Sequence, residues 1–186
     1  MQPVAAVSVD TEPRTDVGAS LGTTFNVSLG RSIPLNTPVL VGELRGQLGI
    51  THAAFTPGLW IRTTPERRNQ LHFGTRVGLA AGAGDLTGFR PFRAPWLGPS
   101  LHLQLATGWG ERGAFSVSLG SEYTVPPIID FTDSDGNAVV MIPGFWSSLD
   151  FRVEVPVGEG AALVLGGGAQ AFYLSPAPFV SIGARF

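Results

Sequence analysis

The end of the chain alternates strictly between apolar and polar side chains. Val180, Ile182 and Phe186 fall on one face of an extended strand, while Ser181 and Arg185 fall on the other. A period of two exposes one face of a strand to an apolar medium and the other to a polar one. This feature constrains the fold most, because such a strand belongs to a sheet that separates two different media.

The same period recurs along most of the chain and predicts an all-β fold. Eight segments are long enough to cross a bilayer as tilted strands, namely residues 17–29, 40–50, 71–79, 97–106, 115–123, 145–155, 161–173 and 180–186. We therefore expect a transmembrane antiparallel up-and-down β-barrel of eight strands. Residues 52–62 shift the apolar phase and contain Pro57. They form either a bulged extension of the second strand or a separate strand, and with residues 4–10 they would raise the number to ten.

The composition excludes several other classes of protein. Only 14% of the 186 residues are charged, against roughly 25% in soluble domains, and no apolar run is long enough for a transmembrane helix. A net charge of −2 argues against a nucleic-acid partner. The absence of cysteine excludes disulfides and thiolate metal sites, and we expect no cofactor.

Alternation alone also fits a soluble barrel with an apolar interior. The polar face of these strands is rich in small residues, and its four acidic and four basic side chains balance, as a closed polar interior requires. We therefore predict a lumenal charge network of Glu43, Arg45, Arg76, Glu122, Asp150, Arg152, Glu154 and Arg185. The aromatic residues near strand ends are expected in interfacial girdles: Trp60, Trp96, Trp109, Tyr123, Phe145, Tyr173 and Phe179.

With the alternating strands and a terminal Phe186, the chain resembles small bacterial outer-membrane β-barrel proteins of the OmpA, OmpX and OmpW types. The resemblance covers residues 17–186 and implies a location in the outer membrane of a Gram-negative envelope. It also implies that Val180, Ile182 and Phe186 form the assembly signal read by the barrel-insertion machinery. Residues 1–16 would be a periplasmic segment or an extra strand. The start lacks the features of a secretory signal, so the sequence is expected to be a mature form.

The connections fit the same arrangement. Short segments rich in Gly and Pro at residues 109–112 and 156–159 predict tight turns, whereas residues 83–95 and 125–143 predict long loops. If the carboxy terminus is periplasmic, both tight turns are periplasmic and both long loops are external.

No catalytic motif emerges from the histidines. His52, His72 and His102 lack the His–Ser spacing of barrel deacylases, and we interpret the last two as lumenal hydrogen-bonding groups. Two loops hold weaker candidates. Arg90, Arg93 and Trp96 are candidate surface contacts for lipopolysaccharide phosphates, and Asp130, Asp133 and Asp135 are a weak candidate for a calcium site, with a solvated turn as the alternative.

Together these features favour a non-enzymatic integral barrel that anchors surface loops or joins an envelope assembly. The alternative is a narrow channel or a conduit for small apolar ligands of the OmpW type, and an outer-membrane lipid-modifying enzyme is a third hypothesis. The expected partners are outer-membrane lipid or lipopolysaccharide, the insertion machinery during biogenesis, and other envelope proteins.

Overall fold

A computed structural model describes residues 13–37, 39–50, 52–63, 67, 69–84, 95–109, 113–132, 138–172 and 175–186. Eleven β-strands make up nearly all of this part of the chain. They are β1 (Arg14–Leu21), β2 (Phe25–Pro34), β3 (Leu40–Gly49), β4 (His52–Phe55), β5 (Gly58–Arg62), β6 (His72–Gly84), β7 (Pro95–Trp109), β8 (Gly113–Thr132), β9 (Ala138–Pro156), β10 (Ala162–Phe172) and β11 (Ser175–Arg185). Within these residues, no helix has the length and apolar character needed to cross a membrane.

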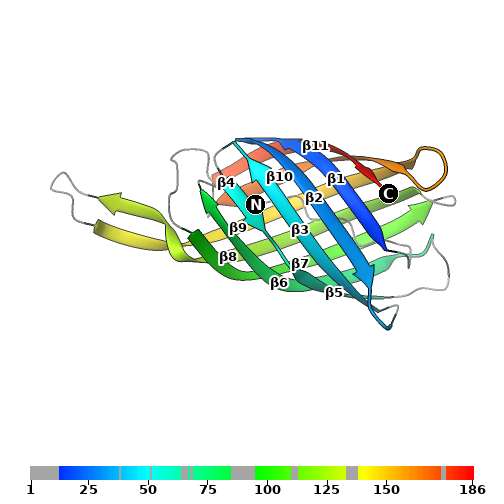
Figure 1. The fold of residues 1–186 in the computed structure, drawn as a ribbon, viewed down its shortest axis with the longest axis horizontal. Coiled ribbons are helices and arrows are strands. Elements are labelled where there is room, and N and C mark those ends of the chain that lie inside the picture. The colour runs from blue at the N-terminus through cyan, green and yellow to red at the C-terminus, as the bar shows by residue number, and fades with distance from the viewer. Residues whose placement is uncertain are drawn as a thin grey trace.

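The strands form one closed antiparallel sheet. Each strand pairs with the strands that precede and follow it around the wall, and β1 pairs with β11, which joins the first strand to the last. Strand order and tilt are visible in Figure 1. Closure pairs the backbone groups that an open sheet would leave at its edges, so the fold is an up-and-down β-barrel.

Strands β4 and β5 make a single crossing of the wall. Pro57 lies between them and has no N–H for the ladder, but the register to β3 is the same on both sides of the interruption. Thr56 still donates its backbone N–H to Arg45 at 2.8 Å, and Pro57 accepts from Leu79 at 3.0 Å. The barrel therefore has ten spans, not the eight that the alternation favoured, and residues 52–62 are a separate span.

The other additional span comes from residues 17–29, which we expected to be one strand. They contain a hairpin, because Leu21 of β1 pairs with Phe25 of β2 across a three-residue turn. A turn with an odd number of residues keeps paired positions at the same parity, so odd-numbered side chains face outward on both strands. The alternation therefore passes through the turn without a break. Residues 4–10, the alternative source of a tenth strand, lie outside the described residues.

The two faces of the wall have opposite character. Large apolar side chains are exposed on the outer face, including Leu29, Leu103 and Phe151, while the inward positions hold buried polar and charged side chains. This is the reverse of a soluble barrel with an apolar interior. The outer face therefore suits a bilayer, and the polar side chains are enclosed.

The aromatic side chains divide between these two faces. Trp109, Tyr123 and Phe145 are exposed on the outside, as interfacial girdles require. Trp60, Trp96 and Phe179 are instead buried inside the barrel, so the girdle prediction is wrong for these three. Each of them occupies a sequence position with the same parity as the inward residues of its strand. Tyr173 lies outside the described residues.

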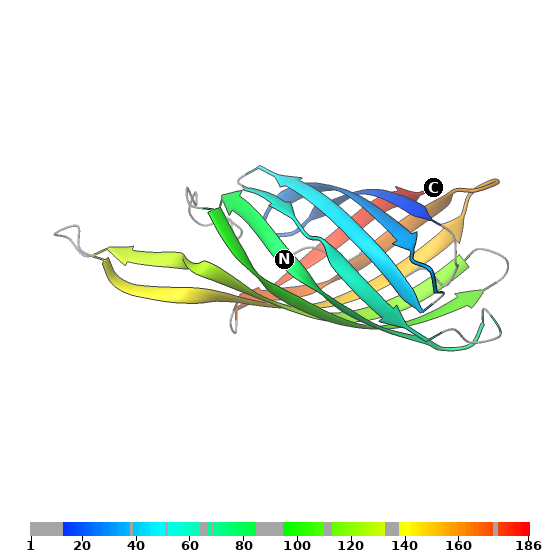
Figure 2. The ribbon, with the colours of Figure 1, turned by 60° about the horizontal axis from the view of Figure 1, so that its bottom comes forward.

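The two ends of the barrel differ. The β9–β10 connection lies at the same end as Phe186 and turns through Gly158 and Gly160, whose φ angles of 70° and 89° suit glycine. At the other end, β8 and β9 continue past the rest of the wall as a hairpin, which both views show (Figures 1 and 2). Residues 85–94, 110–112 and 133–137 lie outside the described part of the chain.

The last strand has the orientation that its alternation indicated. Val180, Ile182 and Phe186 are exposed on the outer face, and Arg185 points inward and is 6% exposed. Phe186 exchanges two backbone hydrogen bonds with Thr15, at 3.0 and 2.9 Å. The first strand, β1, therefore begins at Arg14, three residues before the expected start of the barrel. The beginning of β1 pairs with the last residues of the chain.

Candidate functional site: the polar lumen

The inward face carries more charge than the sequence indicated. The structure places all eight side chains of the proposed network on inward positions, with Arg152 half-buried and the other seven buried. Arg14, Asp16 and Arg62 join them. The described inward charges are therefore six arginines (Arg14, Arg45, Arg62, Arg76, Arg152, Arg185) and five carboxylates (Asp16, Glu43, Glu122, Asp150, Glu154).

Glu43 on β3 is the centre of one cluster. Its Oε2 accepts a hydrogen bond from Arg76 Nε at 2.6 Å and another from Trp60 Nε1 at 3.0 Å. Arg45 on the same strand lies 3.7 Å from Glu43 Oε1. Charge-assisted hydrogen bonds are among the strongest in proteins, so this cluster ties β3, β5 and β6 together on the lumenal side.

Arg76 fixes this cluster through its other nitrogens. Its Nη1 donates to Ser100 Oγ at 3.1 Å, and its Nη2 donates to the backbone carbonyl of Thr56 at 2.9 Å. That carbonyl lies beside Pro57, where the ladder between β4 and β5 is interrupted. The guanidinium therefore pairs the charge of Glu43 and also satisfies an acceptor at the interruption in the wall.

A second cluster lies at the end of the barrel that holds the chain terminus. Glu154 on β9 forms an ion pair with Arg185 on β11, and Arg14 on β1 is 3.9 Å from the same Oε2. All three side chains are buried. Because a buried charge is tolerated only with a partner, this cluster links the strands that close the barrel.

The remaining polar groups line the wall between these clusters. His102 Nε2 is 3.8 Å from Glu122 Oε1. Gln104 donates to Ser118 at 2.8 Å, and Ser148 donates to Asp150 at 3.3 Å.

His52, His72 and His102 are all buried on inward positions. The described residues contain no group of three His, Cys, Asp or Glu side chains that would hold a metal ion. Ser100, the serine two residues before His102, accepts a hydrogen bond from Arg76.

Side chains from opposite walls meet inside the barrel. Arg45 on β3 and Arg152 on β9 line one small cavity together with Asp16 on β1. Four of the ten spans lie between β3 and β9 in either direction around the sheet, so these arginines come from opposite walls. The cavity between them holds only about 30 Å³, enough for one or two waters. Little space is therefore left between these side chains in this cavity.

Sequence reasoning missed four lumenal residues for identifiable reasons. Arg14 and Asp16 share the parity of the polar positions of β1 but precede its first large apolar residue, Val17. Trp60 and Arg62 lie in the segment whose phase was uncertain, and its inward parity became visible only with the register of β5 against β3. For Arg14 and Asp16, extension of the β1 parity toward the start of the chain would have been enough.

The structure describes only part of the two candidate sites that the sequence placed in loops. Arg90 and Arg93 lie outside the described residues, while Trp96 is 4% exposed on the inward face of β7. This position does not match the surface contact for which Trp96 was a candidate, because β7 begins at Pro95 and already carries Trp96 into the lumen. Asp133 and Asp135 lie outside the described residues, as does the side chain of Asp130.

No protein-family model and no curated protein matches the chain. Among solved structures, the NanC porin is similar with a TM-score of 0.53 at 8% identity, covering 94% of this chain and 98% of the porin chain. The translocator domain of the autotransporter NalP from Neisseria meningitidis has a TM-score of 0.39 at 9% identity, covering 94% and 85% of the two chains. Identity this low bears on fold alone. The chain has the closed antiparallel fold of a small outer-membrane β-barrel.

Proposed function

We propose that this protein is a non-enzymatic integral barrel of the bacterial outer membrane, with a closed lumen, that presents the β8–β9 hairpin at the membrane surface. The observation that carries this proposal is the meeting of Arg45 and Arg152 from opposite walls around a cavity of about 30 Å³. A cavity of this size holds no solute larger than water, and we infer that these side chains close the lumen at this level. The barrel then acts as an anchor.

The hairpin supports the anchoring role. Pairing of β7 with β8 ends at Val125, and pairing of β10 with β9 ends at Trp146. Beyond these points β8 and β9 pair only with each other, as far as Thr132 and Ala138. A ribbon held at its base by a closed barrel is placed to contact other envelope components or lipopolysaccharide.

The outer face supports the membrane location. Apolar side chains are exposed on every span of the described wall, and Phe186 is 62% exposed at the end of the chain. Exposure of this extent is unfavourable in water and favourable in lipid. The same terminal strand would be read by the insertion machinery during biogenesis.

A narrow channel is the second candidate. It is favoured by the polar lumen of ten spans and by the similarity to a porin over 98% of the porin chain. In this reading Arg45 and Arg152 would set a constriction through which water and small ions pass.

Planar-bilayer recording separates the two candidates. We expect the wild-type protein to give no steady conductance, and we expect the double variant Arg45→Ala/Arg152→Ala to conduct, because truncation removes the side chains that meet across the lumen. Arg67→Ala is the matched control, since it removes a charge from an exposed turn residue and should remain silent. Steady conductance of the wild type would contradict the closed barrel and establish the channel.

A further inference from the structure

Arg31 is an unusual residue on the outer wall. Among the strand residues whose side chains the structure describes, it is the only charged one on an outward position, where it is exposed on β2 between Leu29 and Ile33. No hydrogen bond or ion pair of its side chain occurs within that part of the chain. A guanidinium on a lipid-facing surface is costly without an anionic partner, so the position itself requires explanation.

A shallow hollow lies directly beside Arg31 on the same face. Its volume is about 770 Å³ and its exposed lining is almost entirely apolar. Two neighbouring rows of outward residues, each crossing several strands, form the lining. The first row is Val17, Leu29, Gly46, Phe55 and Ala81, and the second is Val27, Leu48, Ala53 and Ala83. We call this hollow the wall trough.

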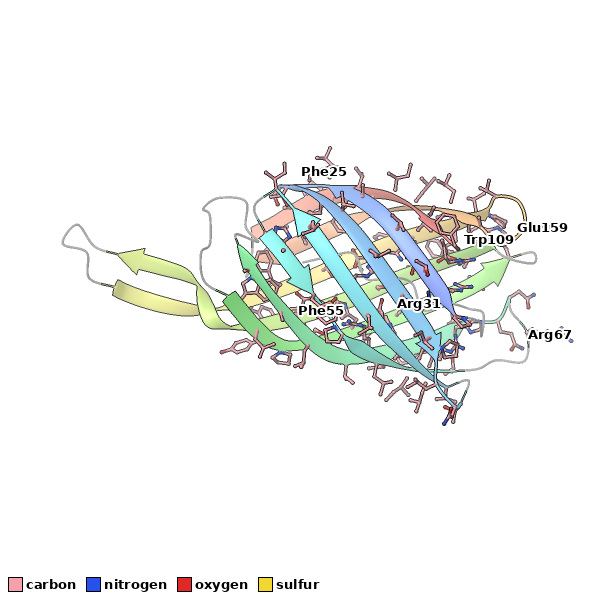
Figure 3. The ribbon with its side chains drawn as sticks, in the orientation of Figure 1. Phe25, Arg31, Phe55, Arg67, Trp109 and Glu159 are labelled. Carbon is pink, nitrogen blue, oxygen red and sulfur yellow. The ribbon has the colours of Figure 1, made fainter. Side chains whose placement is uncertain are left out.

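The floor of the wall trough is made of small residues. Gly46, Ala53, Ala81 and Ala83 lie between larger side chains such as Leu29 and Phe55. A Cβ placed on Gly46 would meet no atom within 4 Å, so the space above this glycine is open. Figure 3 labels Arg31 and Phe55, which is one of the lining residues.

The size of the wall trough matches one acyl chain. Its first row crosses five strands, and strands spaced about 4.8 Å apart give it a length of about 19 Å. One leaflet of a bilayer has a hydrocarbon thickness of about 15 Å, half of the usual 30 Å core. Arg31 lies two residues from Leu29, about 7 Å along the strand, and therefore beside the first row near its β1 end.

The end at which Arg31 lies is the end of the barrel that carries the chain terminus. Arg31 pairs with Thr15 across β1 and β2, and Thr15 pairs with Phe186. A cation at this edge is placed at headgroup level, where arginine binds phosphate with two parallel hydrogen bonds. The apolar trough then extends from the cation into the depth of the wall.

We propose that Arg31 and the wall trough form a binding site for one glycerophospholipid of the leaflet at the carboxy-terminal end of the barrel. The phosphate pairs with the guanidinium, and one acyl chain lies over Gly46 and Ala53. The charge and the apolar trough together select this occupant, because a second copy of the chain presents no outward carboxylate to pair with Arg31 among the strand side chains that the structure describes. This inference rests on the proposed membrane-spanning function.

The test is native mass spectrometry of the detergent-purified barrel with added phosphatidylglycerol. We expect the wild type to retain one lipid. The variants Arg31→Gln, which removes the cation, and Gly46→Leu, which fills the trough, should each retain it about tenfold more weakly, as expected for loss of a charge-assisted contact or of the space for the chain. Diacylglycerol, which lacks the phosphate, should bind the wild type as weakly as phosphatidylglycerol binds Arg31→Gln.

Matched controls separate the site from general effects. Arg67→Gln removes the same charge from a turn, and Ala169→Leu adds the same kind of bulk to an outward position of β10; both should retain lipid as the wild type does. Equal lipid retention by the wild type, Arg31→Gln and Gly46→Leu would overturn the site. Binding of inorganic phosphate without lipid would also overturn it, as would a dimer of the wild type that Gly46→Leu abolishes. A protein that is soluble without detergent would instead overturn the membrane function on which the site rests.

Discussion

At the scale of single residues, glycines determine where the large lumenal side chains lie. Arg45 lies over Gly30, and His102 lies over Gly120, each glycine being the direct cross-strand partner. A Cβ at Gly120 would overlap the imidazole ring of His102. The inward glycines therefore provide the space in which long polar side chains lie flat and reach their partners, so that charge pairing in the lumen depends on residues without side chains.

The cluster around Glu43 gives a direct test of this pairing. Replacement Glu43→Ala leaves Arg76 buried at 2% exposure without its carboxylate, and loss of one partner of a buried pair costs about 3–5 kcal/mol. We expect the free energy of unfolding to fall by this amount in urea titrations of the refolded barrel. Glu159→Ala, at an exposed turn, should leave it unchanged. Equal stability of the two variants would show that the lumenal pair contributes nothing.

At the scale of strands, the period of two predicts which residues share a face but not where the chain turns. Residues 17–29 show this limit, since the turn between Leu21 and Phe25 preserves parity and leaves no mark in the alternation. After Gly49 the outward positions change from even to odd numbers, because Leu48 pairs with Ala53. This change is the phase shift that made the assignment of residues 52–62 ambiguous. Barrel class and lumenal charges were thus predictable from the sequence, whereas the strand number required the register.

The terminal strand allows a prediction about assembly. Phe186 is 62% exposed, so its ring contributes little packing within the protein, while its backbone pairs with Thr15. Phe186→Ala keeps the backbone pairing and should lower the yield of assembled barrel in cells far more than the refolding yield in detergent. Phe25→Ala removes a similarly exposed aromatic at the opposite end of the barrel and serves as the control. If both variants assemble equally well in cells, Phe186 is not the assembly signal.

At the scale of the whole molecule, the arrangement reverses that of a water-soluble domain. Charged residues such as Glu43 and Arg76 are buried, and apolar residues such as Leu103 and Phe151 are exposed. Ten closed spans enclose the polar groups and present the apolar ones to the surroundings. The proposed anchoring role, the closed lumen and the lipid site all depend on this single property.

The most direct test of that property is a spin-label accessibility scan along β7 in liposomes. The sequence has no cysteine, so single cysteines can be placed at Leu103, Gln104, Leu105 and Ala106 without competing thiols. We expect labels at Leu103 and Leu105 to be accessible to lipid-dissolved oxygen and protected from a water-soluble nickel complex, and labels at Gln104 and Ala106 to be protected from oxygen. High nickel accessibility at Leu103 and Leu105 would contradict a membrane-spanning barrel with a polar lumen.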